Sequence, residues 1–214
     1  MTPSGTKMSR STISTLQLFE LFPDQLAARK YLEDRLWPGG AMCPACKTSE
    51  RITNRKGDFY RCNGCKLDFT IRTGTIFERS HVPLHKWLYA MYLLVSARKG
   101  ISSLQLAKEV GITQKSAWFV LHRLREACGD SCAGESQRAP ASMNNIESFY
   151  AVVRRGLYGV YHQTSAKHLP RYLNEFTFRL KNGNVKRHTL QQLDSFVDAV
   201  VGKRITYKDL TAAR

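Results

Sequence analysis

Two pairs of cysteines, each with two intervening residues, are the clearest sign of chemistry in the sequence. Cys43 and Cys46 form the first pair, Cys62 and Cys65 form the second, and fifteen residues separate the pairs. This spacing allows both sulfurs of a pair to turn onto one metal ion, and two pairs supply the four tetrahedral thiolates that suit Zn²⁺. Four thiolates leave no open coordination position for a substrate. The sequence therefore predicts a structural zinc site.

Short runs around these cysteines predict the small β-hairpin domain that would hold them. Residues 51–61 contain a turn at 56–58 between two strand-like runs. After the second pair, Leu67, Phe69 and Ile71 alternate with polar residues, as in a strand with one buried face. The segment is too small to fold around an apolar core alone, so we expect the metal to stabilise it. Four structural thiols or two disulfides are the alternatives.

Three helices are predicted after this domain. The first, over 84–97, is apolar on most sides, and a glycine and two serines then break the chain and cap the next helix. The second helix covers 104–110 and ends at Gly111. Thr113 then caps a third helix over 114–127.

A short helix, a glycine turn and a second capped helix form the pattern of a helix-turn-helix. In that motif the second helix enters the major groove of DNA, with its N-terminal residues nearest the bases. A plain helical hairpin is the alternative. We expect contacts with bases or phosphates from six residues of the third helix: Gln114, Lys115, Ser116, Phe119, Arg123 and Arg125.

The charge balance favours a polyanionic partner. The chain has 33 Lys and Arg against 17 Asp and Glu, a net charge of +16, which favours nucleic acid over a merely basic surface. We expect no membrane partner, because the longest apolar stretch, 87–97, is too short to span a bilayer. Residues 1–15 lack the apolar region of a secretion signal, so we expect a cytoplasmic, nucleoid-associated protein. Cys128 and Cys132 have no further ligand nearby, and we assign them no role.

Several linked segments resemble bacterial insertion-sequence transposases. These proteins have an N-terminal zinc ribbon, a helix-turn-helix and a DDE-type catalytic domain with a ribonuclease-H-like fold. The resemblance covers about residues 15–127 and 144–210. The segments that carry it are WPGGAMCPAC (37–46), YRCNGCKLDFTIRTGTIFERSHVPLHKWLYAMYLL (60–94), GISSLQLAKEVGITQKSAWFVLHRLREA (100–127) and NNIESFYAVVRRGLYGVYHQTSAKHLPRYLNEFTFR (144–179).

The resemblance implies a catalytic site as well as DNA binding. Such transposases hold two Mg²⁺ ions with three acidic or amide residues, and the metals activate water or a 3′-hydroxyl for attack on a phosphodiester. The third ligand of the family lies in the segment that corresponds to 144–149. Glu147 is our candidate for this ligand, and Asn144 is the alternative. Arg154 occupies the basic position of the family that would contact substrate phosphate.

The chain departs from its relatives where the rest of the catalytic domain should be. Only sixteen residues, 128–143, separate the third helix from Asn144, and their only acidic residues are Asp130 and Glu135. A ribonuclease-H-like fold needs a sheet of several strands, which sixteen residues cannot supply. We therefore expect an internal deletion of the catalytic core, with two of the three acidic ligands absent. The alternative is an active transposase in which Asp130, Glu135 and Glu147 still hold Mg²⁺.

These inferences predict a mostly α-helical α+β protein that binds transposon-end DNA. We expect no strand cleavage by the chain alone. A zinc-ribbon, helix-turn-helix regulator of transcription is another alternative. The partners expected are the terminal repeats, with full-length transposase or a second copy as further candidates. The C-terminal part would fold loosely, pack on the helix-turn-helix or associate between chains. The expected domains are an N-terminal helical segment (1–40), the zinc ribbon (41–80), the helix-turn-helix (81–127), a junction (128–143) and a C-terminal catalytic remnant (144–214).

Overall fold

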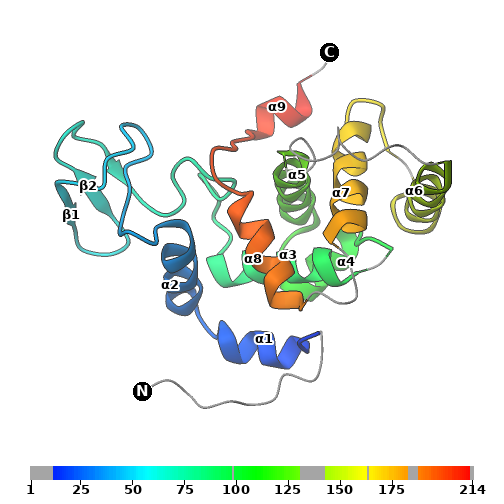
Figure 1. Ribbon diagram of the computed structural model, residues 1–214, viewed down its shortest axis with the longest axis horizontal. Coiled ribbons are helices and arrows are strands. Elements are labelled where there is room, and N and C mark those ends of the chain that lie inside the picture. The colour runs from blue at the N-terminus through cyan, green and yellow to red at the C-terminus, as the bar shows by residue number, and fades with distance from the viewer. Residues whose placement is uncertain (1–11, 98, 131–142, 163, 183–187, 213–214) are drawn as a thin grey trace.

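The computed structural model describes residues 12–97, 99–130, 143–162, 164–182 and 188–212. They form a mostly helical α+β structure with one small antiparallel sheet, as predicted (Figure 1). The helices are α1 (Thr15–Leu21), α2 (Gln25–Leu36), α3 (Leu84–Ser96), α4 (Ser103–Val110), α5 (Gln114–Asp130), α6 (Met143–Gly156), α7 (Leu169–Asn182), α8 (Thr189–Asp198) and α9 (Tyr207–Thr211). The strands are β1 (Ile52–Asn54), β2 (Tyr60–Cys62) and β3 (Asp68–Phe69), and a π-helical turn, η1 (Leu157–Tyr161), follows α6.

The three-stranded sheet lies in the predicted hairpin region. Its order is β1-β2-β3, with antiparallel neighbours and Tyr60 opposite Phe69. Trp37, which follows α2, packs edge-on against the rings of both residues, with centroid distances of 5.4 and 5.9 Å. Phe69 is buried together with Cys43 and Cys62 in one small cluster. Because two of the four cysteines belong to this cluster, the sheet and the cysteine site form one unit.

A second, larger core lies among the helices. It contains buried side chains from α1, α2, α3, α4, α5, α7 and α8, so both halves of the chain contribute to it. Trp87 on α3 is fully buried and packs edge-on against Phe77 at a centroid distance of 5.2 Å. Phe178 on α7 meets Phe196 on α8 in a similar edge-on contact, at 5.1 Å. These contacts join the C-terminal helices to the N-terminal ones.

The α4–turn–α5 segment has the caps that the sequence predicts. Ser102 accepts a hydrogen bond from the backbone N–H of Gln105 at the start of α4. Gly111 ends α4 with a φ of 65°, in the left-handed region that favours glycine. The Thr113 hydroxyl accepts from the N–H of Ser116 at the start of α5. The predicted start of α5 is confirmed, and the helix continues to Asp130.

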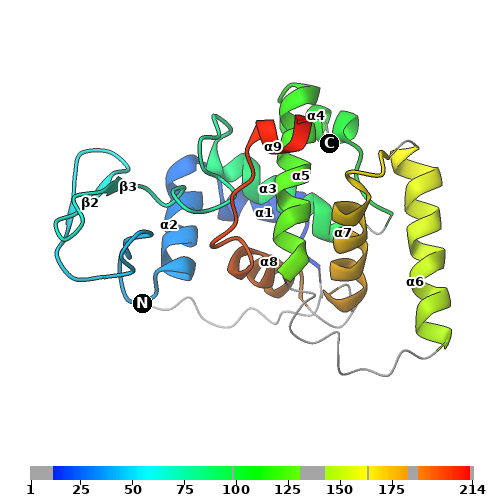
Figure 2. The same ribbon diagram turned by 90° about the horizontal axis from the view of Figure 1, so that it is seen from above.

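The C-terminal helices pack on the preceding ones, which is one of the three arrangements considered from the sequence. The α7 helix lies along α5, and α8 lies against α2 and α3 (Figures 1 and 2). Tyr31 on α2 donates a hydrogen bond to Asp194 on α8. Arg35 on α2 forms an ion pair with Asp198, with an Nη2–Oδ2 distance of 2.5 Å. Polar contacts therefore reinforce the apolar packing of α8.

Within the described residues, the regular strands all lie between positions 52 and 69, and one isolated bridge pairs Thr75 with Val201. The described C-terminal part consists of helices and connecting segments. Residues 131–142 fall outside the described residues, and with them Cys132 and Glu135. None of the helices described is long and apolar enough to cross a membrane.

Candidate metal centre and nucleic-acid interface

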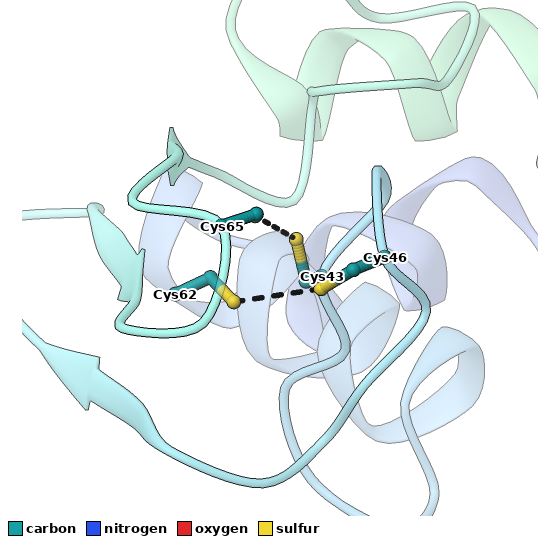
Figure 3. Close-up of side chains that lie close together, drawn as sticks. All are labelled: Cys43, Cys46, Cys62 and Cys65. Atoms are coloured by element: carbon teal, nitrogen blue, oxygen red, sulfur yellow. Dashed lines mark hydrogen bonds between the residues drawn. The ribbon is translucent and has the colours of Figure 1, made fainter.

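The four cysteines predicted to bind zinc converge at one point. Their Sγ atoms all lie within 4.8 Å of one another, and the Cys43–Cys65 and Cys46–Cys62 Sγ distances are both 3.5 Å (Figure 3). Four sulfurs about 2.3 Å from a tetrahedral Zn²⁺ would lie about 3.8 Å apart, so the cluster fits this ion. All four ligand positions are thiols, which gives the site a structural rather than a catalytic character.

The two cysteine pairs have the same backbone geometry. The residue after each pair, Lys47 or Lys66, has a positive φ, of 56° and 58° respectively. The N–H of Cys43 donates to the carbonyl of Thr48 at 3.1 Å, and the N–H of Cys62 donates to the carbonyl of Leu67 at 2.9 Å. Each pair therefore forms a tight turn that directs both sulfurs to the same point.

Hydrogen bonds and neighbouring thiols shift the pKa values of Cys46 and Cys65 in opposite directions. Backbone and side-chain hydrogen bonds from Thr48 lower the pKa of Cys46 to about 6. The backbone of Leu67 acts to lower the pKa of Cys65, but the Cys43 thiol, burial and the other thiols outweigh it and raise that pKa to about 12. Cys46 therefore ionises more readily than Cys65, and a bound cation would favour loss of the proton from Cys65.

Arg29 on α2 attaches the cysteine domain to the helical body. Its guanidinium forms an ion pair with Glu33 at 2.6 Å, on the same helix, and another with Asp58 in the hairpin turn. It also donates to the Tyr60 hydroxyl at 3.3 Å, while that hydroxyl donates to Glu33 at 3.0 Å. This network crosses from α2 to the sheet, so the ribbon has a fixed position on α2.

The predicted DNA-contacting residues at the start of α5 are more exposed to solvent than those in its later turns. Gln114 and Lys115 are exposed, while Ser116 and Phe119 are half-buried. The guanidinium of Arg123 lies over the Phe119 ring, 4.2 Å from its centroid. Of the six residues predicted to contact DNA, only Gln114 and Lys115, in the first turn of the helix, are exposed in this conformation.

The two arginines predicted to reach phosphates point inward instead. Arg123 is 5% exposed and donates to the carbonyls of Ile76 and Glu78, at 2.6 and 2.8 Å. Burial lowers its pKa to about 10. Arg125 is 1% exposed and pairs with Glu175 on α7 at 2.6 Å. We therefore correct the prediction, because neither guanidinium can reach a phosphate in this conformation.

The spacing of apolar residues around Arg125 in the sequence indicates that this side chain is buried. Leu121, Leu124 and Cys128 are buried on α5, and Arg125 lies between them at helical spacing. An arginine inside an apolar stripe needs a buried partner. That partner, Glu175, is fifty residues further along the chain and could not be identified from spacing.

The residues assigned to catalysis by resemblance lie on α6. Glu147 and Arg154 are both exposed, and the Arg154 guanidinium lies 5.8 Å from the centroid of the Tyr158 ring. Asn144 is part of the α6 backbone, but its side chain lies outside the described positions, as does that of Asp130. In the described part of the chain, the cysteine cluster is the group of three or more His, Cys, Asp or Glu residues that could hold a metal ion. Glu147 is not part of such a group there.

The cysteine domain also exposes basic side chains that sequence reasoning did not select. Two of its acidic residues, Asp58 and Asp68, are paired with Arg29 and Arg61 respectively, and Glu50 is exposed. Exposed cations around the hairpin and the cysteine turns remain, and in the described part of the chain no ion pair involves them. They are Lys47, Arg51, Arg55, Lys56 and Lys66. A charge count restricted to 47–66 would have revealed this excess.

Comparisons with known proteins agree with this architecture. Residues 23–68 match the model of the transposase zinc-ribbon domain of IS1595-type elements, and residues 120–181 match the ISXO2-like transposase domain. Both matched domains are of the IS1595 type, so the chain is similar to insertion-sequence transposases with a zinc ribbon in its N-terminal and its C-terminal part.

One relative also comes from a mobile element. It is described as an uncharacterized protein in transposable element ISH50, from Halobacterium salinarum, and is 32% identical over 111 residues. The similarity covers 50% of this chain and 36% of that relative, so the chain spans about a third of the relative's length. No solved structure matches the chain.

Proposed function

We propose that this chain is an insertion-sequence transposase, or an internally truncated derivative of one, that binds transposon-end DNA without cleaving strands by itself. The observation that carries this proposal is the attachment of the cysteine domain, through Arg29 and Asp58, to the body that contains the capped α4–turn–α5 unit. These contacts thereby join two candidate DNA-contacting elements. A DNA-bound role of this kind would place the chain at the nucleoid.

Charge supports duplex DNA as the partner. Lys115 on the first turn of α5 and the basic residues of the cysteine domain are exposed, in a chain with a net charge of +16. Contacts of lysine and arginine with phosphates release bound counterions, so binding must weaken as salt increases. Gln114, beside Lys115, would supply base contacts if α5 enters the major groove.

The C-terminal carboxylates support the absence of independent cleavage. Two-metal catalysis needs several oxygen ligands directed at one point. In the described C-terminal part, four acidic residues are already engaged: Glu175 with Arg125, Asp194 with Tyr31, Asp198 with Arg35 and Asp209 with Thr206. Glu147 remains exposed on α6. We infer that it is the remnant of a catalytic set that the chain does not complete.

An active transposase is the second candidate, because residues 120–181 match a transposase domain. The Mg²⁺ ligands beside Glu147 would then be Asp130 and Glu135. Glu135 and the carboxylate of Asp130 lie outside the described positions. Incubation with Mg²⁺ and end-containing DNA tests this candidate. Nicking that Glu147→Ala abolishes would establish it, and nicking that survives the substitution would point to another nuclease in the preparation.

Association with full-length transposase or a second copy fits the same role. The α6 helix exposes Ile146 and Tyr150, four residues apart, and the following turn η1 exposes Tyr158. A chain that occupies terminal repeats without cutting would inhibit a complete enzyme. Co-expression with that enzyme should lower excision of a marked element, and unchanged excision would contradict the inhibitory role.

An electrophoretic shift experiment tests the DNA-binding proposal directly. A duplex carrying the terminal repeat is compared with a scrambled duplex of equal length, from about 50 to about 200 mM salt. We expect tighter binding to the repeat and a steep loss of affinity with salt. Equal affinity for both duplexes, with no effect of salt, would contradict the proposal.

A further inference from the structure

A C-terminal segment lies along the helix that we assign to DNA reading. We call residues 203–212 the C-terminal strap. At its beginning, Lys203 Nζ donates to the carbonyls of Glu126 and Ala127 near the end of α5, at 3.0 and 2.9 Å. From there the strap runs toward the N-terminal half of α5, and α9 lies beside that helix (Figures 1 and 2).

The strap contacts two of the residues predicted to face DNA. The Tyr207 ring meets the Phe119 ring edge-on, with a centroid distance of 5.9 Å and an interplanar angle of 74°. The Lys115 ammonium lies over the same Tyr207 ring, 5.1 Å from its centroid. The cation that would contact a phosphate is therefore engaged by an aromatic ring of the same chain.

A backbone hydrogen bond holds the chain just before the strap, and a small number of side-chain contacts hold the rest of it. Gly202, just before it, has a φ of 78° and donates its N–H to the carbonyl of Gly74 at 3.1 Å. Further along, Ile205 and Leu210 are buried, and Lys167 donates to the carbonyl of Ala212. The α9 helix has only five residues and would not be stable alone. Its order therefore depends on these few side-chain contacts.

A buried histidine lies on α5 next to the region that the strap covers. His122 lies on α5 one turn beyond Phe119, and its ring is packed between Trp118, His168 and Tyr172. It is fully buried, and neither ring nitrogen has a hydrogen-bond partner among the described residues. Leaving buried polar atoms unpaired has a free-energy cost, and the rings that enclose His122 come from α5 and the α7 region rather than from the strap.

We propose that the C-terminal strap is an intramolecular competitor of duplex DNA for the N-terminal half of α5. The inference rests on the proposed DNA-binding function. Groove reading by α5 uses the face that carries Lys115 and Phe119, and Tyr207 occupies that face. DNA must displace the strap to reach this face of α5. The apparent Kd therefore equals the intrinsic Kd divided by the fraction of molecules with an open strap.

Tyr207→Ala and its matched control Tyr207→Phe test this inference. Tyr207→Ala removes the contacts with both Phe119 and Lys115, whereas Tyr207→Phe keeps a ring in the same place. Tyr207 is 42% exposed, so neither change should unfold the chain. If the strap is closed in about nine molecules of ten, full release lowers the Kd for terminal-repeat DNA about tenfold. Tyr207→Phe should bind like the wild type.

A second variant and a second measurement separate the possible failures. Leu210→Ser loosens the strap from a different contact and should also tighten binding. DNA should increase amide hydrogen exchange in 207–212 while protecting 114–119. If the wild type binds and both loosened variants bind equally or more weakly, the competitor role is overturned and the DNA-binding function stands. If no variant binds DNA, both proposals are overturned.

Discussion

Arg125 on α5 and Glu175 on α7 form an ion pair that is almost completely enclosed, with an Nε–Oε2 distance of 2.6 Å and side-chain exposures of 1% and 0%. The Tyr172 and Tyr161 rings face the Arg125 guanidinium, at centroid distances of 3.9 and 5.1 Å. Tyr161 also donates to Glu175 at 2.7 Å, and Arg179 adds a second ion pair. This network fixes α7 on α5.

Removing one partner of this pair should destabilise the protein strongly. Glu175→Gln leaves the charge of Arg125 buried without its counterion, and we expect a loss of about 3 to 5 kcal/mol in the free energy of unfolding. Urea unfolding followed by circular dichroism measures the change. The exposed Glu147→Gln serves as the matched control and should change stability by less than about 0.5 kcal/mol. Equal stability of the two variants would contradict the role assigned to the pair.

The same pair predicts a loss of stability in acid. Burial alone would raise the pKa of Glu175, but Arg179 and Arg125 hold it below its ordinary value. The stabilisation is therefore present above the unfolded-state pKa and is lost as the pH falls through the folded-state pKa. Unfolding free energies of the wild type and Glu175→Gln should converge as the pH falls below about 4. A constant difference down to pH 2 would contradict this prediction.

His122 should make stability pH-dependent at a higher pH. Burial, followed by the charges of Arg125, His168 and Arg171, lowers its pKa to about 2. The unfolded chain binds a proton near pH 6.5 that the folded chain rejects, so stability falls as the pH decreases below that value. We expect His122→Phe to reduce the loss between pH 7.5 and 5 by about 2 kcal/mol, in parallel denaturant titrations. An unchanged pH dependence would show that His122 binds a proton equally well in the folded and unfolded chains, and would contradict this prediction.

The cysteine cluster predicts a specific effect of losing one ligand. Cys62→Ser should abolish zinc retention and unfold residues 41–77, because the thiolates and the small sheet form one unit. Atomic emission of the purified chain measures zinc, and proteolysis measures the unfolding. Cys128→Ser is the control, since Cys128 lies in the helical core away from the cluster. Unchanged zinc content in Cys62→Ser would refute the four-thiolate assignment.

Lys115 should contribute to DNA binding mainly through charge. Lys115→Ala is expected to weaken binding to repeat and scrambled duplexes alike, and to reduce the slope of log K against log salt by about 0.9. Lys30→Ala removes the same charge from an exposed position on α2 and should leave the slope nearly unchanged. Identical slopes for the two variants would remove Lys115 from the interface. The comparison uses shift titrations at several salt concentrations.

Local sequence was sufficient for much of this structure. The cysteine spacing identified four thiols that do converge, and Ser102, Gly111 and Thr113 marked helix ends that the structure confirms. The α7 helix begins at Leu169, and Pro170 lies in its first turn, where the missing N–H of proline would have no helical partner. Each of these features depends on hydrogen bonds or sterics within a few residues, which is why spacing alone reveals it.

Long-range packing determined the rest. Arg125 looks like a DNA-contacting residue in the sequence, yet it is buried because Glu175, fifty residues away, lies opposite it. Lys115 faces Tyr207, and the C-terminal helices cover α5 and α3, through contacts with no local signature. Sequence periodicity shows which side of a helix is apolar, but only the folded chain shows which distant side chain provides a buried charge with its partner. That difference separates the metal site, determined by the sequence, from the proposed DNA-binding surface, determined by the tertiary structure.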